Sequence, residues 1–302
     1  MLTDILIMPS LYTHKESNVR KTWLYLTAFL LFIIGLGWLI SYFTETLVIL
    51  WIAVIISIFL SFFSYWYSDK IVLRMAKAKL IEKKDNPELY RLVENLCITA
   101  GLPVPKIYII NEVQPNAFAT GRDPNHGVIA VTAGLLEQLD RAELEGVIAH
   151  ELAHIGNRDI LLQTMVVVMV GIIVMITDMF FRMAFWGRSG GKARLIMIAI
   201  ALALAILAPL LAQMMKMAIS RKREFLADAS GAMLTRYPNG LARALEKISK
   251  NSTPLKVAND ATSHLFIACP FKGKENKSWL HRLFMTHPPI EERINRLSQL
   301  TF

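Results

Sequence analysis

Charged residues are scarce in this 302-residue chain. Asp, Glu, Lys and Arg together make up 19% of it, whereas soluble domains usually carry about 25%. Apolar residues reach 54% before glycine is counted. This excess excludes intrinsic disorder and a fully water-soluble fold. The composition therefore predicts a membrane protein that also has soluble parts.

Cysteine is scarcer still, and acidic residues are outnumbered by basic ones. Cys97 and Cys269 are the only two cysteines, and they lack the spacing of a metal-binding pair. A chain kept in the reducing cytoplasm needs no disulfide, so we interpret both as buried thiols.

The excess of basic residues gives a net charge of +9, and these residues cluster beside apolar segments. This favours contact with the lipid bilayer over nucleic-acid binding.

Two uncharged runs near the N-terminus can each cross a bilayer. Residues 23–43 and 47–67 each contain 21 residues without a charge, and a spanning helix needs about 20. The three residues between them predict a tight helical hairpin. A cleavable signal peptide is excluded because the apolar run is too long and lacks a small-residue cleavage site. Basic residues flank the hairpin at both ends, which predicts that both ends face the cytoplasm.

A second apolar pair occupies residues 160–176 and 195–215. Its first run is only 17 residues long, and the turn between the two runs is basic. The pair can therefore span the membrane or form a buried or re-entrant hairpin, and the sequence leaves both open. We expect two to four transmembrane helices in a mostly α protein.

The soluble parts combine helices with a small sheet. Extended stretches at 106–110, 116–121 and 127–132 predict a sheet that contains a β-hairpin. Helical spacing marks the segments 86–100, 221–236, 240–250 and 289–300.

The sharpest chemical motif is the segment from His150 to His154, with the sequence HELAH. Asp140 and Glu143 predict a capping box at the start of its helix, and Gly156 predicts its end. The two histidines lie at positions i and i+4, so both imidazoles can bind one metal ion. Glu151 lies beside them and is well placed to take a proton from a water molecule at the metal.

A third metal ligand has to come from another part of the chain. Glu224 and Asp228 are again four residues apart in a helical segment. Glu224 can complete a site of two histidines and one glutamate, which leaves one position for water or substrate. Asp228 can accept the second ring N–H of a histidine ligand and fix its tautomer. The alternative is an acidic pair that faces solvent among the preceding basic residues.

The order of these motifs resembles a known family. A hydrophobic hairpin, NAFATG, HELAHIGNRD, a second apolar pair, REFLAD and THPPIEERI follow one another, as in the HtpX family of membrane-bound zinc metalloproteases. The related CAAX prenyl proteases share the metal motifs but have more membrane helices. The resemblance implies a zincin-like α+β metalloprotease domain that binds one Zn²⁺ per chain. In it, His150, His154 and Glu224 would be the zinc ligands and Glu151 the general base.

The resemblance also assigns substrate-binding residues. The segment NAFATG would be the edge strand that pairs with the substrate backbone, through Asn116, Ala117, Phe118 and Ala119. His287 and Arg293 of the last motif would lie near the reacting carbonyl as catalytic residues.

The expected function is zinc-dependent endopeptidase activity at the cytoplasmic face of the inner membrane. Its substrates would be misfolded or damaged membrane proteins and unfolded polypeptides, with self-cleavage included. We expect a cytoplasmic segment, a transmembrane hairpin, and two parts of the metalloprotease domain on either side of the second apolar pair. These correspond to residues 1–22, 23–67, 68–159, 160–215 and 216–302.

Three other functions are alternatives to this one. An intramembrane metalloprotease would bury the HELAH helix in an apolar span, but charged residues surround it here. A metal transporter would place its ligands inside crossing helices, and none of the four apolar runs contains a histidine. A catalytically inactive membrane scaffold that binds zinc stays open, because an intact motif does not establish turnover.

Overall fold

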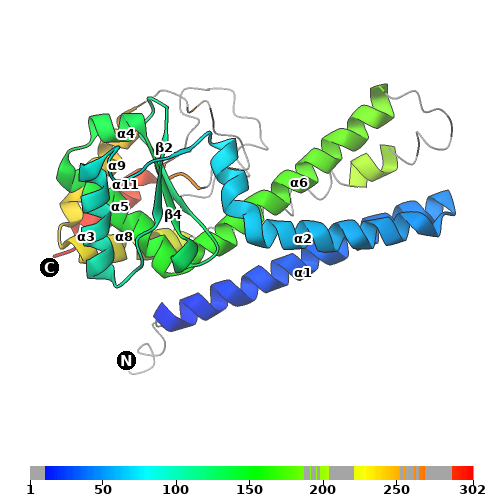
Figure 1. Cartoon of the computed structure of the whole chain (residues 1–302), viewed down its shortest axis with the longest axis horizontal. Helices are drawn as coiled ribbons and strands as arrows, with labels where there is room; N and C mark the ends of the chain where they lie inside the picture. The colour runs from blue at the N-terminus through cyan, green and yellow to red at the C-terminus, as the bar shows by residue number, and fades with distance from the viewer. Residues whose placement is uncertain are drawn as a thin grey trace.

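Three long helices extend away from a small mixed sheet and the helices packed around it (Figure 1). This computed structural model describes residues 11–186, 191, 195, 198–203, 221–251, 255, 257, 262, 265–268 and 288–301. The mostly α membrane fold with a small sheet is confirmed.

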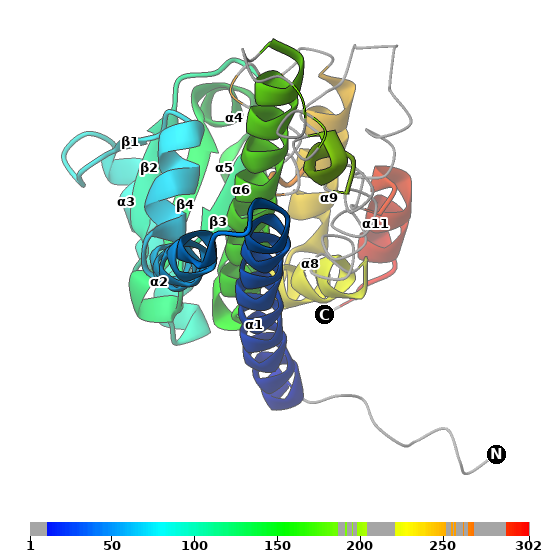
Figure 2. The same ribbon diagram turned by 90° about the vertical axis from the view of Figure 1, so that its right-hand side faces the viewer.

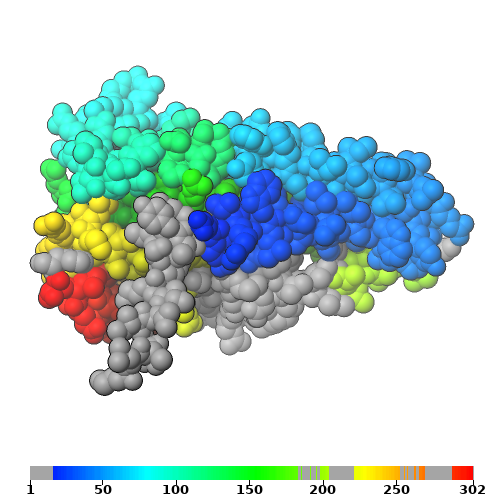
Figure 3. Space-filling model, turned by 90° about the horizontal axis from the view of Figure 1, so that it is seen from below, coloured from blue at the N-terminus to red at the C-terminus, as the bar shows by residue number. Residues whose placement is uncertain are grey.

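The long helices are α1 (Leu11–Thr44), α2 (Leu47–Met75) and α6 (Asp159–Trp186). Each contains a stretch long and apolar enough to cross a membrane. Glu45, with a φ of 56°, reverses the chain between α1 and α2, as expected of a tight hairpin. Helix α6 packs against both of the others, and the three lie side by side when viewed along their length (Figure 2). Seen from below, α1 and α2 form the tapered end of the molecule, opposite the soluble helices (Figure 3).

The third span is longer than its uncharged run of sequence. Helix α6 continues past residue 176, and Asp178 pairs with Arg182 one turn later at 2.7 Å. This i,i+4 ion pair lets the helix carry two charges beyond its apolar part. The described residues thus contain three candidate spans. Most of the fourth apolar run, residues 204–215 included, lies outside the described residues.

The sheet has the strand order β1-β2-β4-β3. Its strands are β1 (Lys79–Leu80), β2 (Lys106–Ile110), β3 (Ala117–Thr120) and β4 (Val128–Thr132). The predicted hairpin is confirmed, because β3 and β4 pair antiparallel. Its turn requires Gly121, where φ is 135° and a Cβ atom would lie 2.4 Å from the carbonyl oxygen of His126. Strands β2 and β4 pair in parallel. Because β4 lies between β2 and β3, β3 forms one edge of the sheet.

In the part of the chain that the structure describes, six helices form the soluble core together with the sheet. They are α3 (Pro87–Ala100), α4 (Ala133–Gln138), α5 (Arg141–Gly156), α8 (Arg221–Thr235), α9 (Pro238–Lys250) and α11 (Ile290–Ser298). The predicted capping box starts α5: Asp140 accepts from the N–H of Glu143, and Glu143 accepts from the N–H of Asp140. The helix ends at Gly156, as predicted, although this glycine is not left-handed. The left-handed residue is Arg158, with a φ of 57°, and α6 begins directly after it.

Candidate metal centre and active site

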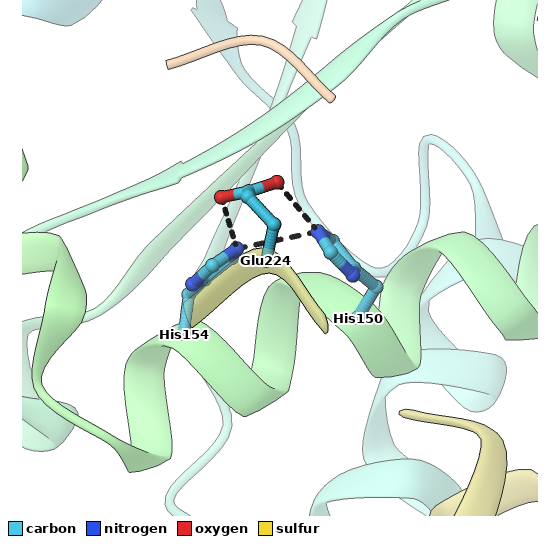
Figure 4. Close-up of side chains that lie close together, drawn as sticks. All are labelled: His150, His154 and Glu224. Atoms are coloured by element: carbon cyan, nitrogen blue, oxygen red, sulfur yellow. Dashed lines mark hydrogen bonds and ion pairs between the residues drawn. The ribbon is translucent and has the colours of Figure 1, made fainter. Parts of the chain in front are cut away.

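Three potential ligands meet where α5 and α8 pack together. His150 and His154 project from one face of α5, and the carboxylate of Glu224 on α8 lies over both rings (Figure 4). The two Nε2 atoms are 3.2 Å apart, and the Glu224 oxygens lie 3.6 Å from that of His154 and 3.9 Å from that of His150. All three residues are buried, with at most 5% of their surface exposed. The alternative of a solvent-facing acidic pair is therefore wrong.

These separations fit a tetrahedral zinc ion. Zinc binds nitrogen at about 2.0–2.1 Å, which places two ligand atoms of one tetrahedron roughly 3.3 Å apart. The ligand set of two histidines and one glutamate is also that of catalytic zinc sites, which keep one position open. The residues present therefore fit Zn²⁺.

The close approach of α5 and α8 depends on glycine. Gly231 of α8 faces α5, and a Cβ atom there would lie 2.9 Å from the backbone nitrogen of His150. It follows Glu224 by two helical turns on the same face of α8. Gly231 thus sets the distance between the helix that carries the histidines and the helix that carries the carboxylate.

Asp228 orients the first histidine. Its Oδ1 lies 3.0 Å from Nδ1 of His150 and accepts that ring N–H, which leaves Nε2 free to bind a metal. Arg293 of α11 donates two hydrogen bonds to the same carboxylate, at 2.6 and 2.8 Å. Burial alone would raise the pKa of Asp228, but the charge and hydrogen bonds of Arg293 outweigh it and lower the pKa to about 2. Burial also lowers the pKa of His150, which keeps that ring neutral for ligation.

Asp159 orients the second histidine, and sequence reasoning missed it. Its Oδ2 lies 3.1 Å from Nδ1 of His154. Its Oδ1 accepts a 2.7 Å hydrogen bond from Nδ2 of Asn18 on the membrane helix α1, and Arg223 of α8 donates to the side-chain oxygen of Asn18 at 3.2 Å. The sequence does carry one signal for this role, because Asp159 is an acidic residue at the start of an apolar helical segment, five residues after His154.

The contact between Asp159 and His154 also changes the protonation state of the metal-free site. Burial disfavours the imidazolium form of His154, but the hydrogen bond to Asp159 and the nearby charge of Glu224 outweigh it. The pKa of His154 rises to about 9 as a result.

Glu151 lies between the three candidate metal ligands and the edge strand β3. Only 2% of its surface is exposed, and burial, with the charge of Glu224 added, raises its pKa to about 7. The backbone N–H of Ala119 on β3 donates a hydrogen bond to its carboxylate. A carboxyl group with a pKa near neutrality can both take up and release a proton.

The predicted substrate strand is β3 together with Asn116, which precedes it. Asn116 offers its carbonyl to the N–H of Thr132, so the alternating ladder directs the backbone groups of Ala117 and Ala119 away from β4. The carbonyl of Ala117 already accepts from the N–H of Ile267 at 2.9 Å. Phe118 points into the core, where its ring meets Phe266 edge to face. Within the described residues, the Ala119 end of the strand is the part nearest Glu151.

Arg293 and His287 are the other two predicted catalytic residues. Arg293 is fully buried. It binds Asp228 with Nε and Nη2, and the carbonyl of Ile267 with Nη1 at 3.0 Å. It therefore positions the carboxylate behind His150, and its contact with a reacting carbonyl stays a prediction. His287 lies outside the described residues, as does Cys269.

Comparison with known proteins agrees with this geometry. Residues 83–301 match the profile of Peptidase family M48. The chain is 47% identical over 292 residues to a protease HtpX homolog of Dictyoglomus thermophilum, covering 96% of this chain and 94% of that one. A protease HtpX homolog of Tropheryma whipplei is 42% identical over 293 residues, covering 96% and 98% of the two chains.

The fold is also similar to a solved structure. The crystal structure of S. mikatae Ste24p superposes with a TM-score of 0.50 at 18% sequence identity. The match covers 95% of this chain and 66% of that chain, so at this identity it supports the fold alone. Together, the profile, the full-length relatives and the buried cluster of two histidines and one glutamate place this membrane protein in peptidase family M48, as an HtpX-like zinc metalloprotease.

Proposed function

We propose that this metalloprotease is a zinc-dependent endopeptidase of the inner membrane whose active site faces the cytoplasm. Its substrates are unfolded polypeptides and misfolded or damaged membrane proteins. The observation that carries the proposal is the placement of Glu151. Its carboxylate lies next to the candidate metal ligands on one side and contacts the edge strand at Ala119 on the other.

His150, His154 and Glu224 would hold one Zn²⁺ per chain. When bound, the ion polarises the scissile carbonyl and lowers the pKa of a water molecule. Glu151 accepts a proton from that water as it attacks the carbonyl and then delivers the proton to the leaving amine. Asp228 and Asp159 hold the two imidazoles in the tautomer that directs Nε2 to the metal.

Substrate recognition by β3 explains a preference for unfolded chains. The free edge of a strand binds another chain through main-chain hydrogen bonds, so side-chain selectivity is low. A folded protein has its backbone groups engaged already, whereas an unfolded segment can pair with the carbonyl of Ala119, whose N–H contacts Glu151. Pairing there brings the substrate backbone beside Glu151.

The position of the membrane helices supports a site close to the bilayer. Helix α6 begins at Asp159, five residues after His154, and α1 contacts the same carboxylate through Asn18. Basic residues follow the uncharged run of α2, among them Lys70, Arg74 and Lys77. Their clustering favours the cytoplasm for the soluble domain.

Cleavage of matched folded and unfolded substrates tests the activity. Detergent-purified protein, stripped of metal and then supplied with Zn²⁺, should cleave a reduced and unfolded disulfide protein at many sites. The same substrate with its disulfides intact should survive. Equal cleavage of both forms would contradict substrate recognition by strand pairing.

Labelling tests the membrane orientation. A thiol introduced by Lys79→Cys on the exposed β1 should react with a membrane-impermeant maleimide in inverted vesicles but not in intact cells. The unsubstituted chain, which contains Cys97 and Cys269, provides the background signal. Labelling in intact cells would place the active site on the opposite side of the membrane.

A further inference from the structure

A pocket lies on the surface between the second half of α2 and the residues around the β3–β4 turn. It has a volume of about 590 Å³. Helix α2 contributes its aromatic residues, and the sheet side contributes polar ones. The lining is Phe62, Trp66, Tyr67, Asp69, Lys70, Val104, Lys106, Arg122, Asn125, His126, Gly127 and Val128. None of these residues belongs to the metal site.

The charge of the lining favours an anion. Lys70, Lys106 and Arg122 are the cations, and Asp69 is the single acid among the lining residues. Arg122 is partly neutralised, because Asp123 lies 3.5 Å from it. No ion pair with either lysine is found in the part of the chain that the structure describes. Two uncompensated ammonium groups thus border one cavity.

An apolar stripe of exposed side chains runs along α2 towards Lys70. Ile55, Phe59, Phe62 and Trp66 follow one another at helical spacing and are 42–66% exposed. From Ile55 to Trp66 the stripe is roughly 16 Å long, which is about the hydrocarbon depth of one leaflet. Lys70 continues the same face one turn beyond Trp66. The surface therefore changes from apolar to cationic at the level of the lipid headgroups.

We propose that this pocket binds one anionic glycerophospholipid. Lys70 and Lys106 take the headgroup phosphate, and an acyl chain lies along the α2 stripe. Trp66 and Tyr67 do not form a cage for choline, because cations already cover their rings. The Arg122 guanidinium lies 4.5 Å from the centre of the Trp66 ring, and the Lys70 ammonium lies 4.8 Å from that of Tyr67. A zwitterionic phosphatidylcholine should accordingly bind less well.

Native mass spectrometry of the full chain in detergent tests the proposal. The probes are dioleoyl phosphatidylglycerol and dioleoyl phosphatidylcholine, which share their acyl chains. One bound phosphatidylglycerol should be retained roughly 30-fold more tightly than phosphatidylcholine, because both lipids carry a phosphate but only the choline cation of phosphatidylcholine cancels its charge near the two lysines. The double variant Lys70→Gln/Lys106→Gln should lose most of this preference. The charge-retaining variant Lys70→Arg/Lys106→Arg should keep it.

A matched control separates the pocket from general charge effects. Lys79→Gln/Lys84→Gln removes the same charge from exposed positions outside the pocket and should leave the preference unchanged. Equal retention of the two lipids by the unsubstituted chain would overturn the proposal. An equal loss of the preference in Lys70→Gln/Lys106→Gln and in Lys79→Gln/Lys84→Gln would also overturn it. A competition arm with inorganic phosphate distinguishes the source of the phosphate. Displacement of the lipid by phosphate at equal concentration would show a phosphate-ion site and refute the lipid assignment.

Discussion

Asn18 of the first membrane helix donates a 2.7 Å hydrogen bond to Asp159, the carboxylate that holds the ring of His154. Both residues are almost fully buried, at 4% and 1% exposure. The membrane hairpin therefore contributes to the metal site through a side chain, although no ligand comes from it. A buried carboxylate without its donor is costly, so the contact constrains how α1 docks on the soluble domain.

Replacing Asn18 should weaken metal binding. Asn18→Ala removes the donor to Asp159 and leaves that carboxylate less firmly placed behind His154. Loss of a residue that supports a metal ligand in this way typically lowers metal affinity about 10–100-fold. Competition with a zinc chelator measures the effect, and the exposed Asn95→Ala is the matched control. Equal zinc affinity in the two variants would show that α1 has no part in the site.

Gly231 should be intolerant of even a methyl group. In Gly231→Ala the new Cβ atom would lie 2.9 Å from the backbone nitrogen of His150, so α8 would have to move away from α5. We expect a destabilisation of about 1–3 kcal/mol, as is usual for overpacking, together with reduced zinc affinity. Thermal unfolding and chelator competition report the two effects. Gly171→Ala, at a position with open space around its Cβ, should change neither.

Zinc affinity should rise with pH between about 7 and 9. The pKa of His154 in the metal-free protein is raised to about 9, so the ring is protonated at neutral pH and must lose that proton to bind metal. Affinity then increases by about tenfold per pH unit and levels off above the pKa. Asp159→Asn removes the carboxylate that stabilises the imidazolium and should flatten the dependence. Calorimetry in buffers of different ionisation enthalpy counts the released protons, and a flat profile in the unsubstituted chain would refute the assignment.

Glu224→Ala should lower zinc occupancy, since it removes the only carboxylate that approaches both Nε2 atoms among the described residues. Metal analysis after dialysis against trace zinc measures this loss. The exposed glutamate variant Glu88→Ala should retain full occupancy. If Glu224→Ala also retained it, the third ligand would lie elsewhere in the chain.

The sequence predicted the parts of the fold and site that depend on local pattern. The spacing of His150 and His154, the capping box of α5 and the β3–β4 hairpin follow from side-chain periodicity and turn residues. The helical spacing also predicted that Asp228 would support a histidine ligand, but the contacts of Asp159 with His154 and Asn18 could not be predicted from local pattern. Asn18 and Asp159 are 141 residues apart, and only the packing of α1 against the start of α6 brings them together.

Long-range packing also determines two further features of the sheet and the site. The parallel pairing of β2 with β4 arises because the intervening β3 adds to the outer side of β4, which no local pattern specifies. The family resemblance alone predicts that Arg293 lies near the reacting carbonyl. Its burial and its two hydrogen bonds to Asp228 depend on where α11 docks against α8.

The proposed role of Glu151 is to carry the proton at a zinc site formed by His150, His154 and Glu224. Its most direct test compares the original chain with Glu151→Gln, both purified without metal and then supplied with Zn²⁺. Zinc content and cleavage are measured together, with an unfolded protein and the chain itself as substrates. We predict equal zinc content in both forms and cleavage only by the original chain. Equal cleavage by both forms would contradict the role of Glu151, and zinc binding without cleavage by either would indicate an inactive scaffold.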